Sequence, residues 1–202
     1  MNTDLNWKLL NTKSTKLRKV TSIRKLIIDI INENQSIKRY MRFTTKMPLA
    51  KKSIDNNGNI KVQNDLVNSL LIDSNEGEQC LFSGSFNPEM SNIQIPYIFV
   101  HSYRTRVRGS DSTINFAIHI VCPQKYNTLQ HYGDERIYEI GEQIIELLDG
   151  YTIENSDIAE VTGNVTFICE GDIEEYRLSK TSDIIVLTIP IVVRNVAMRS
   201  RV

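Results

Sequence analysis

The sequence lacks any long hydrophobic run, since no stretch of about 18 consecutive apolar residues occurs in it. Its N-terminus, MNTDLNWKLLNTKSTKLRK, also lacks the apolar segment of a secretory signal. We therefore expect no membrane-spanning segment and no membrane partner.

Cysteine is scarce as well. Cys80, Cys122 and Cys169 are far apart and form no CxxC pair. A metal site needs ligands in closer clusters. An odd number of cysteines in a chain without an export signal predicts free thiols in a reducing compartment. We expect neither a metal site nor a cofactor.

Catalytic signatures are missing too. Neither of the glycine-rich phosphate loops, GxGxxG and GxxxxGK[ST], is present, and no GxSxG turn occurs. We expect His119 to be a polar residue on a sheet face and His131 to lie at the entry of a helix. The chain is therefore predicted not to be an enzyme. The enzymatic alternative would use the loop 123–134 as the rim of a pocket.

Hydrophobic residues make up 41% of the 202 positions and charged residues 24%, which is typical of a globular protein. The net charge is zero, yet residues 1–52 carry 13 basic and three acidic residues, a balance of +10, and the rest carries −10. Such a split favours head-to-tail association of copies or a basic arm for nucleic acid. The simpler interpretation is a solvated tail on an acidic domain.

We predict a basic N-terminal arm at residues 1–20 and a single α+β domain at 21–202. Within the domain, SIRKLIIDIINENQSIKRYMRF predicts one amphipathic helix with Ser22 as its N-cap. A loop-rich insert follows at about 43–92, where Asn57-Gly58 is a strong hairpin signal.

Extended segments dominate from residue 93 onwards. A strand before the turn 109–112 and TINFAIHIVC after it predict a long protruding antiparallel hairpin. Asp134 is the expected N-cap of a second helix, and Gly150 its left-handed C-terminal residue. Two strands follow, of which DIIVLTIPIVVRN is apolar on both faces and is expected to be central or covered, with Pro190 at an edge or bulge. The predicted fold is an antiparallel sheet with two amphipathic helices packed on one face.

Two charged features are candidates for an interaction surface. Alternation along YRTRVRG places three arginines on one face of a strand near the hairpin tip: Arg104, Arg106 and Arg108. Spacings of three and four along the second helix place four glutamates in one stripe on its outer face: Glu135, Glu139, Glu142 and Glu146. Each set is either simply solvated or meets a partner. For the arginines, that partner would be the acidic stripe of a neighbouring copy or the phosphates of DNA.

The order of these elements resembles that of tail terminator and tail-completion (neck) proteins of tailed bacteriophages. The resemblance rests on PYIFVHS leading into a hairpin, INFAIHIVC, a polar loop, ERIYEIGEQIIELLDG and the β-branched final strand DIIVLTIPIVV, and it covers about residues 20–195. It implies a structural virion protein, made in the host cytoplasm, that forms a ring, usually of six subunits, at the head–tail junction. Such a ring ends the tail tube and joins it to the neck or connector proteins, and packaged DNA passes through its lumen.

The longer insert at 43–92 and the basic arm depart from that pattern. A second hypothesis is a nucleic-acid-binding protein that uses KSTKLRKVTSIRK and the strand Arg104–Arg108. It predicts an affinity for DNA that falls steeply with salt. The acidic domain and the few aromatic residues among the basic ones argue against it.

Overall fold

The structure is a computed structural model that describes residues 16–54, 57–62, 66–71, 79–87, 93–106, 112–130, 134–153, 165–178 and 183–196. Its helices are α2 (Lys16–Glu33), α3 (Gln35–Arg42), α4 (Gln124–Asn127) and α5 (Arg136–Leu148). Its strands are β1 (Lys52–Ile54), β2 (Ile60–Val62), β3 (Leu81–Ser83), β4 (Tyr97–Arg106), β5 (Ser112–Pro123), β6 (Thr152–Ile153), β7 (Val165–Cys169), β8 (Glu174–Arg177) and β9 (Ile184–Val196).

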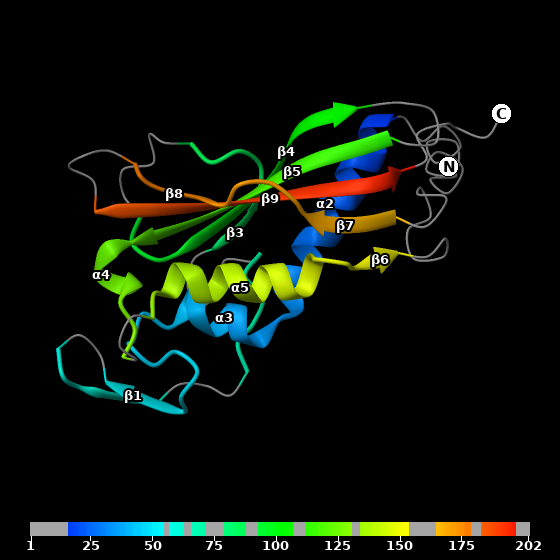
Figure 1. The fold of residues 1–202 in the computed structure, drawn as a ribbon. Coiled ribbons are helices and arrows are strands. Elements are labelled where there is room, and N and C mark those ends of the chain that lie inside the picture. Colours follow the sequence, from blue (N-terminus) through cyan, green and yellow to red (C-terminus); the bar gives the residue numbers. More distant parts are fainter. Residues whose placement is uncertain are drawn as a thin grey trace, which may run out of the picture.

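A seven-stranded sheet forms the body of the molecule (Figure 1). Its strand order is β3-β4-β5-β9-β7-β6, and β8 pairs with β9 outside this path. The α+β prediction is confirmed. The sheet is mixed rather than purely antiparallel, because β3 runs parallel to β4. The predicted hairpin of β4 and β5 is present, and β5 is paired along its other edge with β9.

Strand β9 is central, as its apolar residues on both faces predicted. It pairs with β5 on one edge and, on the other, with β8 at Ile185–Thr188 and with β7 at Ile191–Arg194. Pro190 lies between these two stretches, at the point where the partner on that edge changes. A residue without a backbone N–H is tolerated there because no strand of the second edge pairs with it.

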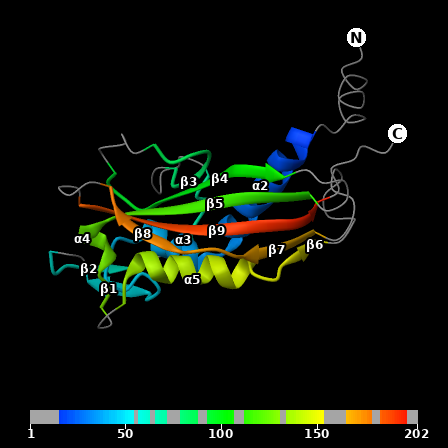
Figure 2. The same ribbon diagram turned by 45° about the horizontal axis from the view of Figure 1, so that its top comes forward.

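The helices cover one face of the sheet, as predicted. Figure 2 shows α3 and α5 below the strands, and α2 crosses behind them. Helix α5 approaches closely because Gly141 has no side chain: a Cβ there would lie 2.9 Å from Leu187 Cδ2 and 3.5 Å from Ile189 Cδ1. The apolar core therefore lies between this helix layer and the strand residues that face it.

The first predicted helix differs from the structure in two ways. Helix α2 begins at Lys16, so Ser22 is not its N-cap and residues 16–20 are helical rather than part of an arm. The helix also breaks at Asn34, whose side chain accepts a hydrogen bond from the Ile37 N–H at 2.9 Å and caps a separate helix, α3. Asparagine competes with the helical backbone in this way, which favours a cap over a helix interior. Residues 1–15 of the predicted arm lie outside the described residues.

The second helix begins one residue later than predicted. Glu135, and not Asp134, is the N-cap of α5, and its side chain makes no capping bond. The C-terminal prediction is confirmed, because Gly150 has φ 76° just beyond the C-cap Asp149. This left-handed backbone costs little in glycine.

The insert contains the hairpin that Asn57-Gly58 predicted. Strands β1 and β2 pair with each other and form a sheet of their own, with Lys52 opposite Val62 and Ile54 opposite Ile60. Gly58 in the connection has φ 86°, which suits glycine. Figure 1 shows this hairpin standing apart from the main sheet, beyond α3.

Candidate interaction surfaces

The arginine strand lies at the edge of the sheet. Strand β3 pairs with β4 only at Ile98–Val100, so within the described residues the end of β4 has a neighbour on one side only. Arg104 and Arg106 are exposed there and pair across to Asn115 and Thr113, which places both on one face. Arg108 lies outside the described residues.

A β-bulge precedes these arginines, since the register shifts between Ser102 and Arg104 and leaves Tyr103 without a partner on β5. Bulges and charged side chains are devices that protect a sheet edge from pairing with another chain. Neither Arg104 nor Arg106 makes an ion pair with any described residue. Their guanidinium groups are therefore available to a carboxylate or phosphate of a partner.

The four glutamates of α5 do not form one continuous exposed stripe, so that prediction was wrong. Glu142 and Glu146 are exposed, whereas Glu135 and Glu139 are half-buried. The carboxylate of Glu135 accepts a hydrogen bond from Asn127 Nδ2 at 2.5 Å. That of Glu139 accepts one from the hydroxyl of Tyr40 at 3.1 Å. Burial, and then Glu139, raise the pKa of Tyr40 to about 12, so the phenol keeps its proton.

The exposed acidic surface continues instead onto β8. All four residues of this strand are exposed, Glu174 and Glu175 among them. The hydroxyl of Tyr138 on α5 donates to the carboxylate of Glu175, which joins helix and strand into one surface. The sequence showed these acids as a charged turn, but pairing of β8 with β9 was not foreseen because β8 carries no apolar alternation.

A buried arginine was also missed. Arg136, at the first position of α5, is fully buried and donates to four carbonyl oxygens: Tyr126 at 2.7 Å, Tyr40 at 2.6 Å, Phe43 at 2.8 Å and Thr45 at 2.5 Å. Burial lowers the pKa of Arg136 to about 10, which still leaves it charged near neutrality. Three of its acceptors, the carbonyls of Tyr40, Phe43 and Thr45, lie in the last turn of α3 or just after it, where the helix dipole favours a cation. The residue fastens α3, α4 and α5 together, which is a structural role.

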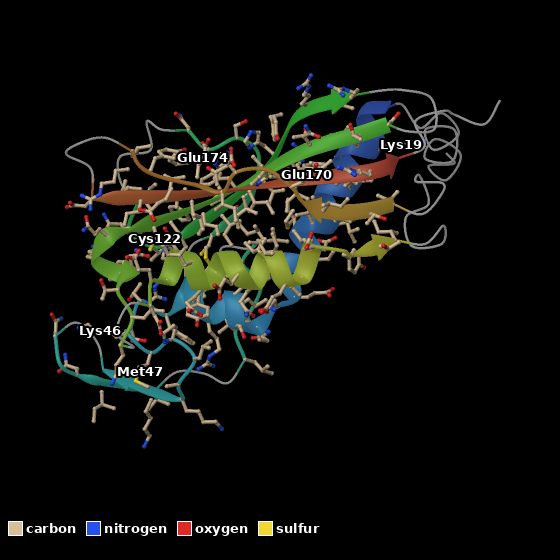
Figure 3. All side chains as sticks on the ribbon, viewed as in Figure 1. Lys19, Lys46, Met47, Cys122, Glu170 and Glu174 are labelled. Atoms are coloured by element: carbon tan, nitrogen blue, oxygen red, sulfur yellow. The ribbon has the colours of Figure 1, made fainter. Side chains whose placement is uncertain are left out.

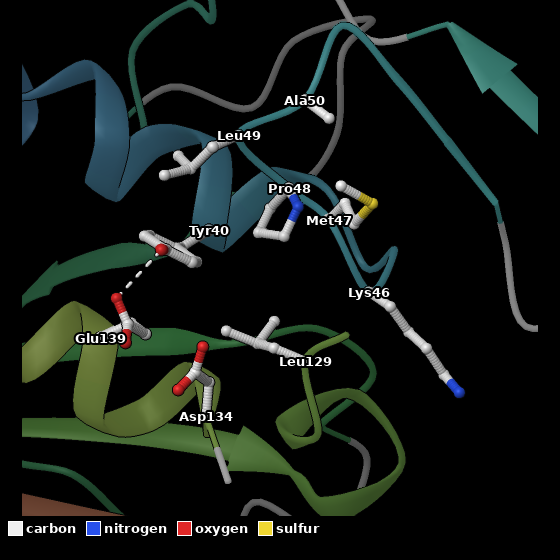
Figure 4. A pocket seen from close by; sticks show the side chains of 9 residues that line it. All are labelled: Tyr40, Lys46, Met47, Pro48, Leu49, Ala50, Leu129, Asp134 and Glu139. Atoms are coloured by element: carbon white, nitrogen blue, oxygen red, sulfur yellow. Dashed lines mark hydrogen bonds between the residues drawn. The ribbon is translucent and has the colours of Figure 1, made fainter. Parts of the chain in front are cut away.

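One pocket of about 210 Å³ lies between α3, the start of α5 and the segment 46–50 (Figure 4). Leu129 and Asp134 line it, as the enzymatic alternative predicted for the loop 123–134. Its described lining contains no serine, cysteine or histidine, and the amine of Lys46 points away from it (Figure 4). The polar part of the lining consists of Asp134, Glu139 and the phenol of Tyr40, which donates to Glu139, and the rest is mostly apolar.

Two histidines stack on the sheet face opposite α5. The rings of His101 and His119 lie 4.9 Å apart with an interplanar angle of 12°, and His119 Nδ1 lies 2.9 Å from Thr188 Oγ1. Burial, followed by the neighbouring His101, lowers the pKa of His119 to about 4, so the ring is neutral near pH 7. His119 is thus a sheet-face residue. His131 lies outside the described residues.

The other candidates for chemistry are the cysteines and clusters of metal-ligating side chains. Burial raises the pKa of Cys122 to about 12, which keeps it a thiol. None of the three cysteines is in a disulfide.

Within the described residues, no group of three or more histidine, cysteine, aspartate or glutamate side chains lies together in a way that would hold a metal ion. None of the described helices combines the length and the hydrophobicity that crossing a membrane requires.

Neither the models of known protein families nor the curated proteins gave a match to this chain.

Proposed function

We propose that this chain is a structural virion protein of a tailed bacteriophage. Six copies of it form a ring at the head–tail junction, where the ring ends the tail tube and joins it to the neck. Its partners are further copies of itself, the tail tube protein and the neck or connector proteins, and DNA passes through the lumen. It performs no catalysis.

One observation supports this proposal above the others: two exposed surfaces of opposite charge occur on separate parts of one chain. Arg104 and Arg106 lie at the edge strand β4, and Glu142 and Glu146 lie on α5 in the helix layer. Opposite charges that do not meet within a chain can meet between copies. Contacts between two different surfaces are head-to-tail, and they close into a ring when the rotation permits.

Charge reversal tests the proposal. The solution mass of the wild-type chain, measured by light scattering over a range of protein concentrations, is expected to rise to six times that of the chain. Arg104→Glu/Arg106→Glu is expected to reduce association at least tenfold, because two attractive contacts per interface become repulsive. Lys25→Glu, which reverses an exposed charge on α2, serves as the matched control and should leave the mass unchanged.

Imaging of assembled particles gives the second test. In assemblies that lack this chain, heads and tails should form but remain separate. Adding the wild-type chain should restore their joining. A chain that is absent from the head–tail junction of complete particles would refute the proposal, whatever its mass in solution.

The exposed arginines also support a second candidate function, nucleic-acid binding, since guanidinium groups that have no acidic partner among the described residues suit phosphates. Titration with a DNA duplex at several salt concentrations separates the two. If DNA binding is the function, the affinity should fall steeply with salt, and the double arginine variant should flatten that dependence. An affinity too weak to measure at physiological salt would exclude this candidate.

A further inference from the structure

The hairpin of β1 and β2 exposes a cluster of apolar side chains. Ile60 and Val62 of β2 are 74% and 75% exposed, and Leu66 just beyond the strand is 74% exposed. Single exposed apolar residues are common on protein surfaces, but a group of them on one small hairpin marks an interaction site. Leu49, 49% exposed, continues this surface towards the pocket beside the hairpin.

Lysine borders the apolar face of the hairpin. Lys52 lies directly opposite Val62 in the register, so the two side chains share a face, and Ile60 is on that face as well, two residues from Val62. Lys51 and Lys52 are both exposed. The hairpin therefore presents a surface that is apolar in the middle and basic at its border.

The base of the hairpin is fixed by polar side chains from the helices. Arg39 donates to the carbonyl oxygens of Pro48 at 3.1 Å and Ala50 at 2.9 Å, just before β1. On the returning chain, Gln35 exchanges two hydrogen bonds with the backbone of Val67, at 3.0 and 3.3 Å. The side chain of Asn32 accepts from the Leu70 N–H at 2.7 Å.

These contacts hold the base of the hairpin in place. A two-stranded hairpin alone is marginally stable in water, and this one has no place in the main sheet. Its base is nevertheless held on both sides by hydrogen bonds from α2 and α3. The apolar side chains are thus presented outward from a fixed base, as a docking element requires.

A surface of complementary chemistry exists on the same chain, around β8. Its exposed apolar side chains are Ile173 at 51% and Tyr176 at 40%. Asp172 and Glu174 are also exposed, and Glu174 shares a face of β8 with Tyr176, two residues further along the strand. Within the described residues, β8 has a strand neighbour on one edge only, β9. This β8 surface is apolar with an acidic border, the counterpart of the hairpin.

We infer that the β1–β2 hairpin of one copy docks on the β8 surface of a second copy. Lys51 and Lys52 then face Asp172 and Glu174, and the apolar side chains of the two surfaces are buried against each other. This inference rests on the proposed ring and names the contact between its subunits. The two surfaces are distinct, because Glu174 lies on β8 in the main sheet and Lys46, beside the hairpin, lies below it (Figure 3). In the proposed ring the contact between them is head-to-tail.

Serine substitutions test the apolar part of the contact. Ile60→Ser/Val62→Ser is expected to weaken self-association at least tenfold in sedimentation velocity runs, because the buried apolar area is lost while the lysines remain. Both residues are exposed in the single chain, so circular dichroism and the melting temperature should match those of the wild type. Lys25→Glu is again the control.

A charge exchange tests the pairing of the two surfaces. Lys51→Glu/Lys52→Glu and Asp172→Lys/Glu174→Lys should each, when alone, associate at least tenfold more weakly than the wild type, since like charges then meet at every contact. An equimolar mixture of the two variants should recover at least half of the wild-type association, because each variant offers the matching surface to the other.

The outcomes separate this inference from the proposed function. Association that survives all of these variants would overturn the hairpin contact and leave the ring intact as a proposal. A mixture no better than its components would also overturn the contact. Conversely, association that depends on the hairpin, in a chain that is absent from the head–tail junction, would support the contact and refute the proposed function.

Discussion

At the scale of single residues, Arg136 shows how a fully buried charge holds three segments together. Among the described residues none of its hydrogen-bond partners is a carboxylate, and its donors reach four backbone carbonyls from α3, α4 and the segment after α3. Without the guanidinium, all four oxygens would lose this donor, and the bonds to Tyr40 and Thr45 are buried, where such a loss is costly. The sequence offered no signal for this role, because the acceptors are backbone atoms up to 96 residues away.

We predict that Arg136→Met lowers the free energy of unfolding by about 4 kcal/mol, because charge-assisted hydrogen bonds are lost and their acceptors stay buried. Arg136→Lys should recover part of this loss, since lysine keeps the charge but cannot reach all four carbonyls. Urea denaturation measures both variants. The exposed Arg177→Met is the control and should change stability by less than about 0.5 kcal/mol. An Arg136→Met variant as stable as that control would contradict the fastening role.

The stacked histidines predict a pH dependence. Burial lowers the pKa of His119 to about 4 in the folded chain, below the ordinary value of 6.5. The unfolded chain therefore binds the proton more readily, so the stability from this residue is fully present above pH 6.5 and is lost as the pH falls towards 4. After allowance for the partial exposure of the ring, we expect a loss of about 1–2 kcal/mol over this window.

Denaturation at several values between pH 7.5 and pH 4.5 measures this loss. His119→Asn, whose amide can still bond Thr188, should show a smaller slope in the same window. Equal slopes in the variant and the wild type would mean that other groups cause the pH dependence.

At the scale of elements, the sequence predicted those parts of the fold where a local pattern and the tertiary environment agree. The alternation of Ile114, Phe116, Ile118 and Ile120 gave β5, and Gly150 marked the end of α5. The break at Asn34 was missed because apolar residues continue at helical spacing across it, while one side-chain cap decides the outcome. The early start of α2 was missed because the sequence around Lys19 and Val20 carries no sustained periodicity. Both residues are nevertheless buried in the structure.

At the candidate site, the sequence could predict which charged side chains are exposed only where charge alone decides exposure. Arg104, Arg106, Glu142 and Glu146 are exposed, as their charge suggests. Glu139 is instead hydrogen-bonded to Tyr40, 99 residues earlier in the chain, and such a pairing has no local signature. The apolar face of the β1–β2 hairpin was likewise hidden, because Ile60 and Val62 suggest burial in any sequence-based argument.

Packing of α5 on the sheet gives a third prediction. In Gly141→Ala the new Cβ would meet the flexible end of Leu187 at 2.9 Å, and the gain in helix propensity of about 1 kcal/mol offsets much of that strain. We expect a net change within about 1 kcal/mol. Gly141→Leu has no such space and should destabilise the fold by about 3 kcal/mol or more, because α5 must move away from Leu187 and Ile189. Thermal melting compares both with the exposed Glu142→Leu, and equal melting temperatures of the two leucine variants would contradict the close approach.

At the scale of the whole molecule, the main feature is separation of charge in a chain of zero net charge. A neutral chain experiences no net repulsion between copies, so specific contacts between opposite surfaces can determine how copies associate. The arginine edge, the lysines of the hairpin and the acids of the β8 surface are each exposed among the residues that the structure describes. Head-to-tail contact between copies satisfies such surfaces in pairs and can close into a ring.

This arrangement predicts how association responds to salt. Between 0.05 and 0.5 M NaCl the range of electrostatic attraction shrinks from more than 10 Å to less than 8 Å, so the association constant of the wild-type chain should fall several-fold. In Ile60→Ser/Val62→Ser the constant should start lower and fall by the same factor, because the lysines remain. In Lys51→Glu/Lys52→Glu the dependence should be flat or reversed, since added salt screens repulsion instead of attraction. Sedimentation velocity at three salt concentrations measures the association constants of all three chains. If the wild-type constant does not change with salt, attraction between opposite charges does not bring the copies together.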